Sequence, residues 1–391
     1  MDVSELESNL DSEVRSSRYN RGELAAYVHR PVFEHVEYPL PSYKWNEVST
    51  NGPSRNVVAL QAVVERMDIN DDPYIKSLRA QYSKLPPGDQ QKRIDQKLSK
   101  ALNKQDTFSH TGMKRFAQTA CDICYDLGPW AADWFVATVI QMATSSSGIY
   151  NNIMASWQEK EKRYLMSLLQ QVPLVPVPTD PLDMLDGLSP RVQKLVEILM
   201  REEELSRAEN EPYSGIVFVT RRDSVLVLGE ILSRLSSTSG LFRVGRLLGT
   251  SSSFRRHAFL DITRAMLKET ATDTLEDFRA GEKNLIISTA VAEEGIDIQA
   301  CGSVIRFDPP ENMVAWAQSR GRARRKKSRF IIMFDDVNRR SAVAQWEDME
   351  RQMMTLYTSN DGRLSKEEEE EEDSPTTFKV ESTGYGYSTF V

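Results

Sequence analysis

"GIVFVT" (residues 215–220) is a short, continuous apolar run that ends in a hydroxyl side chain, and three similar runs follow it. These runs, also rich in Ile or Val, are "NLIIST" (284–289), "SVIRF" (303–307) and "RFIIMF" (329–334). Segments with helical spacing separate the runs at 223–236, 272–280 and 311–320. Apolar strands that alternate with helices predict a parallel sheet covered on both faces, which is an α/β doubly wound domain.

The composition is typical of a globular protein, with 391 residues, 40% hydrophobic content, 27% charged content and a net charge of −8. Three cysteines make no disulfide framework, which favours a reducing compartment. No signal peptide is recognisable, and no apolar run reaches the roughly 18–20 residues that span a bilayer. We therefore expect an intracellular protein without a membrane segment, cytoplasmic or nuclear.

Charge is distributed unevenly along the chain. Residues 213–340 carry a net charge of about +6, whereas 341–391 carry about −8, partly in the run "KEEEEEEDS" (366–374). A basic segment in an acidic chain indicates either a polyanionic partner for that segment or a solvated basic face.

The first part of the chain has a different pattern. Residues 1–170 show apolar positions three and four apart and few strand-like runs, which predicts an all-α region. The proline-rich segment 170–185 predicts an extended connector. Ser189 followed by Pro190 then predicts the start of a helix, because serine caps helices and proline is tolerated in the first helical position.

Polar residues follow the predicted strands. Thr220 and Arg221 follow the first strand, Thr289 ends the second and Asp308 follows the third. Because the carboxyl ends of parallel strands meet at one edge of a sheet, where ligands bind, we expect these side chains to be close together.

The stretch "AWAQSRGRARRKKSRF" (315–330) has a spacing that suits phosphate binding. Arg322 and Arg325 are three apart, and two guanidinium groups clamp the oxygens of a phosphoryl group. Gln318, one turn earlier, has a carboxamide that orients an attacking water, and Gly321 is expected to let Arg322 turn away from the helix. On the residues alone, a solvated basic tract is an equal alternative.

Several motifs resemble those of known helicases. "VFVTRR", "ISTAVAEEGIDIQACGSVIRFD" and "AQSRGRARR" resemble the fourth, fifth and sixth motifs of superfamily 2 helicases, and the second and third are similar to the branch that contains Dicer and the RIG-I-like receptors. "RGELAAYVHRPVFEHVEYP" resembles the start of the helical insertion of that branch. "FKVESTGYGYSTF" resembles the opening of a Dicer dimerisation domain, so the chain is similar to Dicer-like proteins of the fungal type.

The resemblance implies a RecA-like C-terminal helicase lobe with an all-α insertion domain. The implied divisions are a helical insertion (1–170), the RecA-like lobe (181–340), a connecting helix (341–358), an acidic disordered linker (359–377) and the truncated start of a dimerisation domain (378–391).

It also implies roles for single residues. Arg322 and Arg325 would contact the γ-phosphate of ATP with Gln318 beside them, while Gly295 and Asp297 would face the nucleotide ribose. The RNA backbone would be contacted by Thr220, Arg221 and Thr289. The sequence departs from the pattern at Ala323, where many relatives have glycine.

Two catalytic elements of such helicases are absent from the sequence. It contains neither a G-x-x-x-x-G-K-[ST] phosphate loop nor an Asp-Glu-x-His run. The resemblance implies that a first RecA-like lobe upstream of Met1 shares the ATP and holds Mg²⁺, and that a ribonuclease III part follows downstream. We expect the chain alone to lack catalysis and the intact protein to act on double-stranded RNA in RNA silencing and antiviral defence. The alternatives are a stand-alone RNA-binding or partner-binding module without ATPase activity and a gene-model fragment with no independent role.

Other candidate sites have simpler interpretations. We expect no metal, because Cys121 and Cys124 have no second pair at zinc-binding spacing and lie on an apolar helix. Trp130 and Trp134, one turn apart, are expected in the core. The basic residues between Lys92 and Lys104 form either a solvated helix face or an RNA contact.

Overall fold

The computed structural model describes residues 31–105, 107–144, 159–248, 271–289, 301–335, 343–349 and 351–352. The chain divides into two compact units, Met1–Asp336 and Val337–Val391. In the second unit, residues 343–349 and 351–352 are helical and fall inside the expected connecting helix. The predicted acidic linker and dimerisation segment lie outside the described residues.

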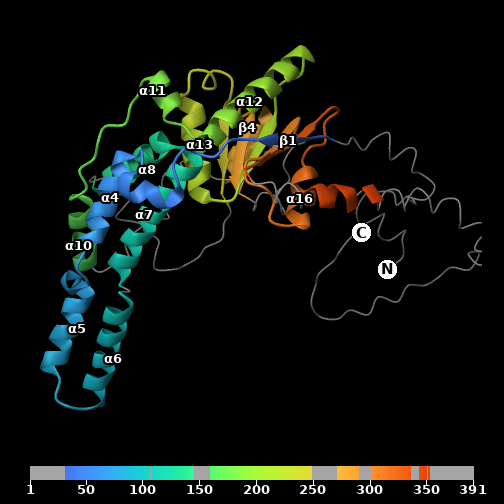
Figure 1. The fold of residues 1–391 in the computed structure, drawn as a ribbon. Helices are drawn as coiled ribbons and strands as arrows, with labels where there is room; N and C mark the ends of the chain where they lie inside the picture. The colour runs from blue at the N-terminus through green and yellow to red at the C-terminus, as the bar shows by residue number, and fades with distance from the viewer. Residues whose placement is uncertain are drawn as a thin grey trace, which may run out of the picture. The chain divides into compact units, whose positions relative to one another are not determined.

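The first unit contains one parallel sheet of six strands in the order β1-β6-β5-β2-β4-β3 (Figure 1). The strands are β1 (Val32–Glu37), β2 (Gly215–Val219), β3 (Val244–Leu247), β4 (Leu285–Thr289), β5 (Ser303–Arg306) and β6 (Arg329–Phe334). The four runs predicted from the sequence are β2, β4, β5 and β6, and the prediction of a parallel α/β sheet is confirmed.

The two faces of the sheet are covered by different helices. Side chains at alternate strand positions, such as Val217, Ile287 and Ile305, join the large core formed with α12 (Pro190–Ala208) and α13 (Arg222–Arg234). On the opposite face, α16 (Met313–Arg320) packs Trp316 edge-on against Phe330 of β6, and α15 (Ala271–Ala280) contacts β3. Burial on both faces explains why the central strands are continuous apolar runs.

The sequence-based expectation of a purely helical first region was wrong for β1, which pairs in parallel with β6. The segment "VFEHVE" mixes apolar and charged residues without strict alternation and is only partly buried at the edge of the sheet, so it lacks the continuous apolar run of the central strands. Phe33 stacks on Trp316 with ring centroids 5.9 Å apart. Glu34 accepts two hydrogen bonds from Arg201 of α12, at 2.6 and 2.7 Å, so β1 is fixed to the sheet domain by both apolar and charged contacts.

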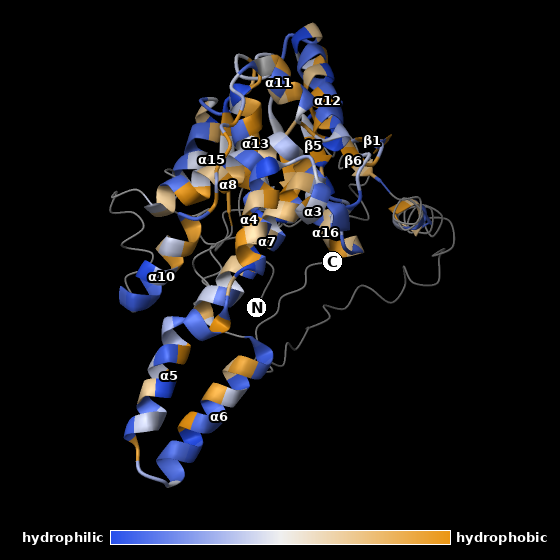
Figure 2. Ribbon diagram, turned by 60° about the vertical axis from the view of Figure 1, so that its left-hand side comes forward, coloured by the Kyte–Doolittle hydropathy of each residue, from blue (hydrophilic) through white to orange (hydrophobic). Residues whose placement is uncertain are grey.

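The rest of the first region is helical. Its helices are α3 (Val48–Asn51), α4 (Arg55–Glu65), α5 (Pro73–Lys84), α6 (Asp89–Lys104), α7 (Phe108–Leu127), α8 (Pro129–Thr144) and α10 (Glu159–Leu169). Within this unit, α5 and α6 form a hairpin that extends away from the other helices (Figure 1), and hydrophilic residues predominate along it (Figure 2).

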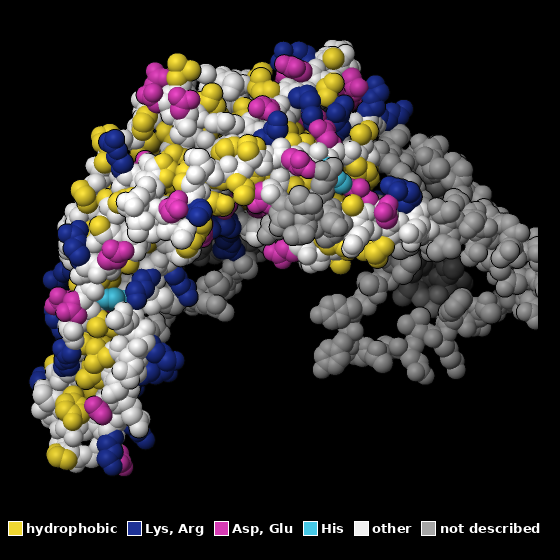
Figure 3. All heavy atoms as spheres, viewed as in Figure 1, with side chains coloured by type: hydrophobic (Ala, Val, Ile, Leu, Met, Phe, Trp, Pro, Cys, Tyr) yellow, Lys and Arg dark blue, Asp and Glu magenta, His cyan; other side chains and the backbone are white. Residues whose placement is uncertain are grey.

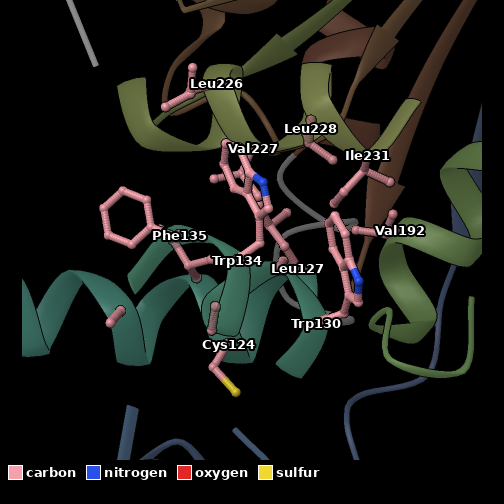
Figure 4. Close-up of a cluster of buried hydrophobic side chains, with 14 of the residues drawn as sticks. Cys124, Leu127, Trp130, Trp134, Phe135, Val192, Leu226, Val227, Leu228 and Ile231 are labelled. Atoms are coloured by element: carbon pink, nitrogen blue, oxygen red, sulfur yellow. The ribbon is translucent and has the colours of Figure 1, made fainter. Parts of the chain in front are cut away.

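One apolar core joins the helical region (α3 to α10) to the sheet domain, which comprises the six strands with α12, α13, α15 and α16. Trp130 and Trp134 of α8 are buried with Leu127 of α7 against Val227 and Ile231 of α13 (Figure 4). Trp130 also donates a hydrogen bond to the carbonyl of Pro178 at 2.8 Å, so its polar atom is satisfied. The prediction that both tryptophans belong to the core is confirmed.

The connector at 170–185 is not extended throughout. Asp180 caps the short helix α11 (Pro181–Asp186) by accepting a hydrogen bond from the backbone N–H of Leu182 at 2.8 Å. Pro181 occupies the first helical position, where its missing N–H costs nothing. The prolines that argued against a helix therefore include one that starts it. The helix predicted after Ser189 is confirmed as α12, and the Ser189 hydroxyl accepts from the N–H of Val192.

Gly128 connects α7 to α8 in a conformation that only glycine adopts readily, with φ 109° and ψ 166°. A Cβ there would lie 2.4 Å from the backbone nitrogen of Ser189 and 2.5 Å from the carbonyl oxygen of Gly187. We predict that Gly128→Ala lowers the free energy of unfolding by about 2 kcal/mol or more, measured by urea denaturation.

Gly240→Ala is the matched control, because a Cβ at that position would meet no atom within 4 Å. It should change the stability by no more than about 0.5 kcal/mol. Equal effects of the two variants would show that the conformation of Gly128 does not limit the junction.

Candidate functional site

The carboxyl ends of β2 and β5 form the first part of the candidate site. The backbone N–H of Thr220 donates to the Asp308 carboxylate at 2.6 Å, so residues that follow two neighbouring strands are directly bonded. The side chain of Thr220 is exposed, whereas Thr289, at the end of β4, is only 6% exposed. Of the two threonines, Thr220 has the surface position that a contact with a ligand requires.

Arg221 lies at the same edge and is already bound by two carboxylates. Its guanidinium contacts Asp122 of α7 and Asp223 of the first turn of α13. Burial alone would lower the pKa of Arg221, but the hydrogen bond and charge of Asp223 and the charge of Asp122 raise the pKa above its usual range. The residue is therefore a permanently charged arginine between two acids, in a position that faces the helical region.

A second arginine, Arg191 at the start of α12, is buried next to the carboxyl end of β5 and contacts the residues that follow this strand. It donates to the Asp308 carboxylate at 2.5 Å and to the carbonyl of Phe307 at 2.6 Å, and its Nη1 lies 3.7 Å from the Asp126 carboxylate of α7. The guanidinium also lies 4.0 Å from the centroid of the Phe307 ring. Arg191 is 8% exposed, so these partners replace most of the water that a buried charge loses, although its Nε has no hydrogen-bond partner among the described residues.

Of the two carboxylates near Arg191, Asp126 makes the weaker interaction with it. Burial raises the pKa of Asp126 to about 6, and the nearby charge of Arg191 opposes that rise only in part. Asp308, bonded to Arg191 and to the Thr220 N–H, is the main partner of the buried arginine. Sequence reasoning missed Arg191, Asp122 and Asp126, since nothing in their spacing distinguishes them from ordinary surface charges on helices.

The segment with the predicted phosphate-binding arginines lies at the opposite edge of the sheet. Helix α16 runs back from the carboxyl end of β5, and Cys301, which precedes β5, donates its N–H to the carbonyl of Arg322 at 3.0 Å. Ala323 forms a parallel bridge with Cys301. Arg325 donates to the carbonyl of Pro212, before β2, at 3.0 Å. Arg322 and Arg325 are thus anchored at the amino ends of the strands and are separated from Thr220 and Arg221 by the length of the sheet.

The expectation that Gly321 lets Arg322 turn away from the helix finds no support in the backbone conformation of Gly321. Gly321 has φ −59° and ψ −8°, an ordinary helical geometry, and a Cβ would lie 3.4 Å from the carbonyls of Ala317 and Gln318. Hydrogen bonds from Gly321, Arg322 and Ala323 back into α16 continue the helix as tight turns. The backbone direction after α16 therefore comes from these turns and from the bridge to Cys301.

The remaining candidate residues are the two predicted to face the nucleotide ribose and the cysteine pair on α7. Gly295 and Asp297 lie outside the described residues. Among the residues that are described, no three His, Cys, Asp or Glu side chains are grouped to hold a metal ion. Cys121 and Cys124 are buried free thiols whose pKa burial raises to about 11 and about 12, so they pack as neutral groups.

Residues 191–327 match the family model described as "Helicase conserved C-terminal domain". The chain is 32% identical over 392 residues to Dicer-like protein 2 of Aspergillus terreus and 35% identical over 391 residues to Dicer-like protein 2 of Cryphonectria parasitica. These alignments cover 98% and 97% of this chain but 26% and 24% of the two relatives.

The chain is a Dicer-like helicase C-terminal region. It spans about a quarter of the length of the curated relatives that it matches. Among solved structures, the helicase domain of Pyrococcus furiosus Hef is 20% identical, with a TM-score of 0.35, over 88% of this chain and 64% of that chain. No described helix of this helicase region combines the length and apolar character needed to cross a membrane.

The raised pKa of Asp126 predicts a pH dependence of stability. A carboxyl whose pKa rises from 3.8 to about 6 on folding stabilises the folded state while it is protonated, and that contribution is lost as the pH rises from about 4 to about 6. We predict that Asp126→Asn removes this part of the pH dependence and leaves the stability at pH 7.5 unchanged or slightly higher, because Arg191 keeps Asp308.

The measurement is urea unfolding of both chains across pH 4–8. The side chain of Asp126 is 32% exposed, so solvent screening reduces the effect. Parallel curves for the two chains would contradict the assignment, and a large loss of stability at pH 7.5 would mean that the ionised carboxylate is the required partner of Arg191.

Proposed function

We propose that this helicase region forms the second half of an ATP-dependent double-stranded-RNA helicase module, with the nucleotide and the RNA at opposite edges of its sheet. The observation that supports it best is the fixed backbone of 321–325. Both arginines of the sixth-motif pattern lie there: the backbone carbonyl of Arg322 accepts from the N–H of Cys301, and the guanidinium of Arg325 donates to the carbonyl of Pro212. Arginines that stabilise a transferring phosphoryl group act through such preorganisation.

The nucleotide would be shared with another lobe. Hydrolysis of ATP requires a phosphate cradle, a metal and an arginine. This sequence has the arginines but neither a phosphate loop nor an Asp-Glu-x-His run. We propose that Arg322 and Arg325, with Gln318 beside them, serve ATP and Mg²⁺ bound by a first RecA-like lobe, and that this chain does not hydrolyse ATP by itself.

The RNA would be bound mainly through its phosphates. Thr220 and Arg221 present a hydroxyl and a guanidinium at the carboxyl edge. The helical region adds exposed basic side chains along the α5–α6 hairpin (Figure 3), which on α6 are Lys92, Arg93, Lys97, Lys100 and Lys104. Lys104, Lys114 and Arg115 also line an open groove where α6 meets α7. Binding of this kind is salt-sensitive and nearly independent of sequence.

In the intact protein, this module would belong to a Dicer-like protein with a ribonuclease III part that acts in RNA silencing and antiviral defence, in the cytoplasm. The alignment of nearly the whole chain to Dicer-like protein 2 of several fungi supports this assignment.

The nucleotide role is tested by Arg322→Ala in a module that combines this chain with a phosphate-loop lobe of a Dicer-like protein. We predict that the variant lowers RNA-stimulated ATP hydrolysis by about 10³-fold or more, as loss of an arginine finger does, and leaves RNA affinity unchanged. Lys326→Ala, an exposed neighbour with the same loss of charge, is the control and should keep full activity. Robust hydrolysis by this chain alone, lost in Arg322→Ala, would contradict the shared site.

A binding module without hydrolysis is the second candidate, and the basic α5–α6 hairpin favours it. Filter binding of duplex RNA to the chain, with and without ATP and across salt concentrations, separates the two. We predict that affinity falls steeply with salt and that Lys97→Ala with Lys100→Ala reduces the slope of log K against log salt by about one for each phosphate that these lysines neutralise. Affinity that ATP does not alter even when the first lobe is present would favour the binding module, whereas affinity that salt does not alter would exclude both.

A further inference from the structure

We propose that Asp122 of α7 occupies Arg221 in place of an RNA phosphate, so that the helical region controls access of this strand-end arginine to RNA. The proposal rests on the proposed function, in which Arg221 contacts the RNA backbone. It adds a competing carboxylate that comes from a different part of the fold.

The three side chains form an ion-pair triad, Asp122–Arg221–Asp223. Arg221 donates through Nε to Asp223 at 3.3 Å and through Nη2 to the same carboxylate, while its Nη1 contacts Asp122. The side chains of Arg221 and Asp122 are 28% and 26% exposed. The triad is therefore at the surface of the carboxyl edge, where a ligand reaches it without unfolding either helix.

Asp122 is held in this position by its own partners. Its Oδ1 accepts from the indole N–H of Trp45 at 2.9 Å and from the amide of Gln118 at 3.2 Å. Helix α7 also packs against α13, the helix that begins next to Arg221. The carboxylate is thus presented to the guanidinium by the helical region, whereas Asp223 is a near neighbour of Arg221 in the chain.

The charges at this point oppose the binding of RNA. Two carboxylates around one guanidinium leave a local net charge of −1, which repels a phosphate. Asp223 accepts from Nε and Nη2 of the Arg221 guanidinium, and Asp122 occupies the Nη1 donor that a phosphate oxygen would use. A phosphate therefore binds Arg221 only when Asp122 is displaced, and RNA binding is linked to the position of α7.

The alternative is a structural ion pair that only orients Arg221 and fastens α7 to the sheet domain. The two accounts predict opposite signs for Asp122→Asn. Asparagine keeps an oxygen for Trp45 and Gln118 but removes the charge that competes with phosphate. Competition predicts tighter binding of RNA, whereas an orienting role predicts weaker binding.

The experiment is filter binding of a blunt-ended duplex RNA to the whole chain at several salt concentrations. Asp122→Asn should bind about fivefold more tightly, as expected for removing one surface ion pair, and its salt slope should increase by about one phosphate contact. Asp183→Asn on α11, an exposed carboxylate with the same change of charge, should have a much smaller effect. The gain should disappear in the double variant Asp122→Asn, Arg221→Gln. Unchanged or weaker binding by Asp122→Asn would overturn the proposal.

A second readout does not depend on RNA. Phenylglyoxal modifies arginines whose guanidinium is accessible, and peptide mass spectrometry measures its rate at Arg221. The proposal predicts faster modification in Asp122→Asn than in wild type or Asp183→Asn. If neither wild type nor Asp122→Asn binds RNA, the proposed function fails, and the modification rate then decides whether Asp122 shields Arg221: a faster rate supports the shielding, and an equal rate contradicts it.

Discussion

In a parallel sheet all strands end at one side, the carboxyl edge, and begin at the other, the amino edge. The chain must therefore return from the first to the second after every strand. In this helicase region, Thr220 and Arg221 leave the carboxyl end of β2, while α16 carries the chain from the carboxyl end of β5 back to the amino end of the sheet. The bridge between Cys301 and Ala323 fixes the return point. Because of this constraint, Thr220 and Arg221 lie at the opposite end of the strands from Arg322 and Arg325. The topology therefore separates the surface proposed for RNA from the surface proposed for the nucleotide.

Charged contacts connect the first of these surfaces to the helical region. Arg191 is buried beneath the strand ends and depends mainly on Asp308, since an unpaired guanidinium there would be costly, while Asp126 lies 3.7 Å away. One turn earlier on α7, Asp122 contacts Arg221. Asp122 and Asp126 thus place two carboxylates of one helix against two arginines of the sheet domain. The apolar core around Trp130 and Val227 supplies most of the adhesion, and the acid–arginine pairs determine how the strand ends meet α7.

The central strands, α12 and its cap could be predicted from the sequence because their signals are local: burial on both faces makes an apolar run, and a cap needs only neighbouring residues. Strand β1 could not, because its pairing with β6 joins residues almost 300 positions apart along the chain (Val32 with Arg329). Gly321 keeps a helical geometry, and the direction of the chain after α16 depends on the bridge between Ala323 and Cys301, which the spacing of residues does not reveal. Arg191 and Asp122 were missed because their partners come from distant elements, and such pairs have no spacing to detect.

Photo-crosslinking tests most directly whether RNA binds at the carboxyl ends of the strands and not at the arginines that follow α16. A duplex RNA with photoreactive bases, irradiated with the whole chain and analysed by peptide mass spectrometry, should form crosslinks at residues 219–224 and along α6. Segment 321–328 should remain uncrosslinked. Major crosslinks at 321–328, with none at 219–224, would contradict the account.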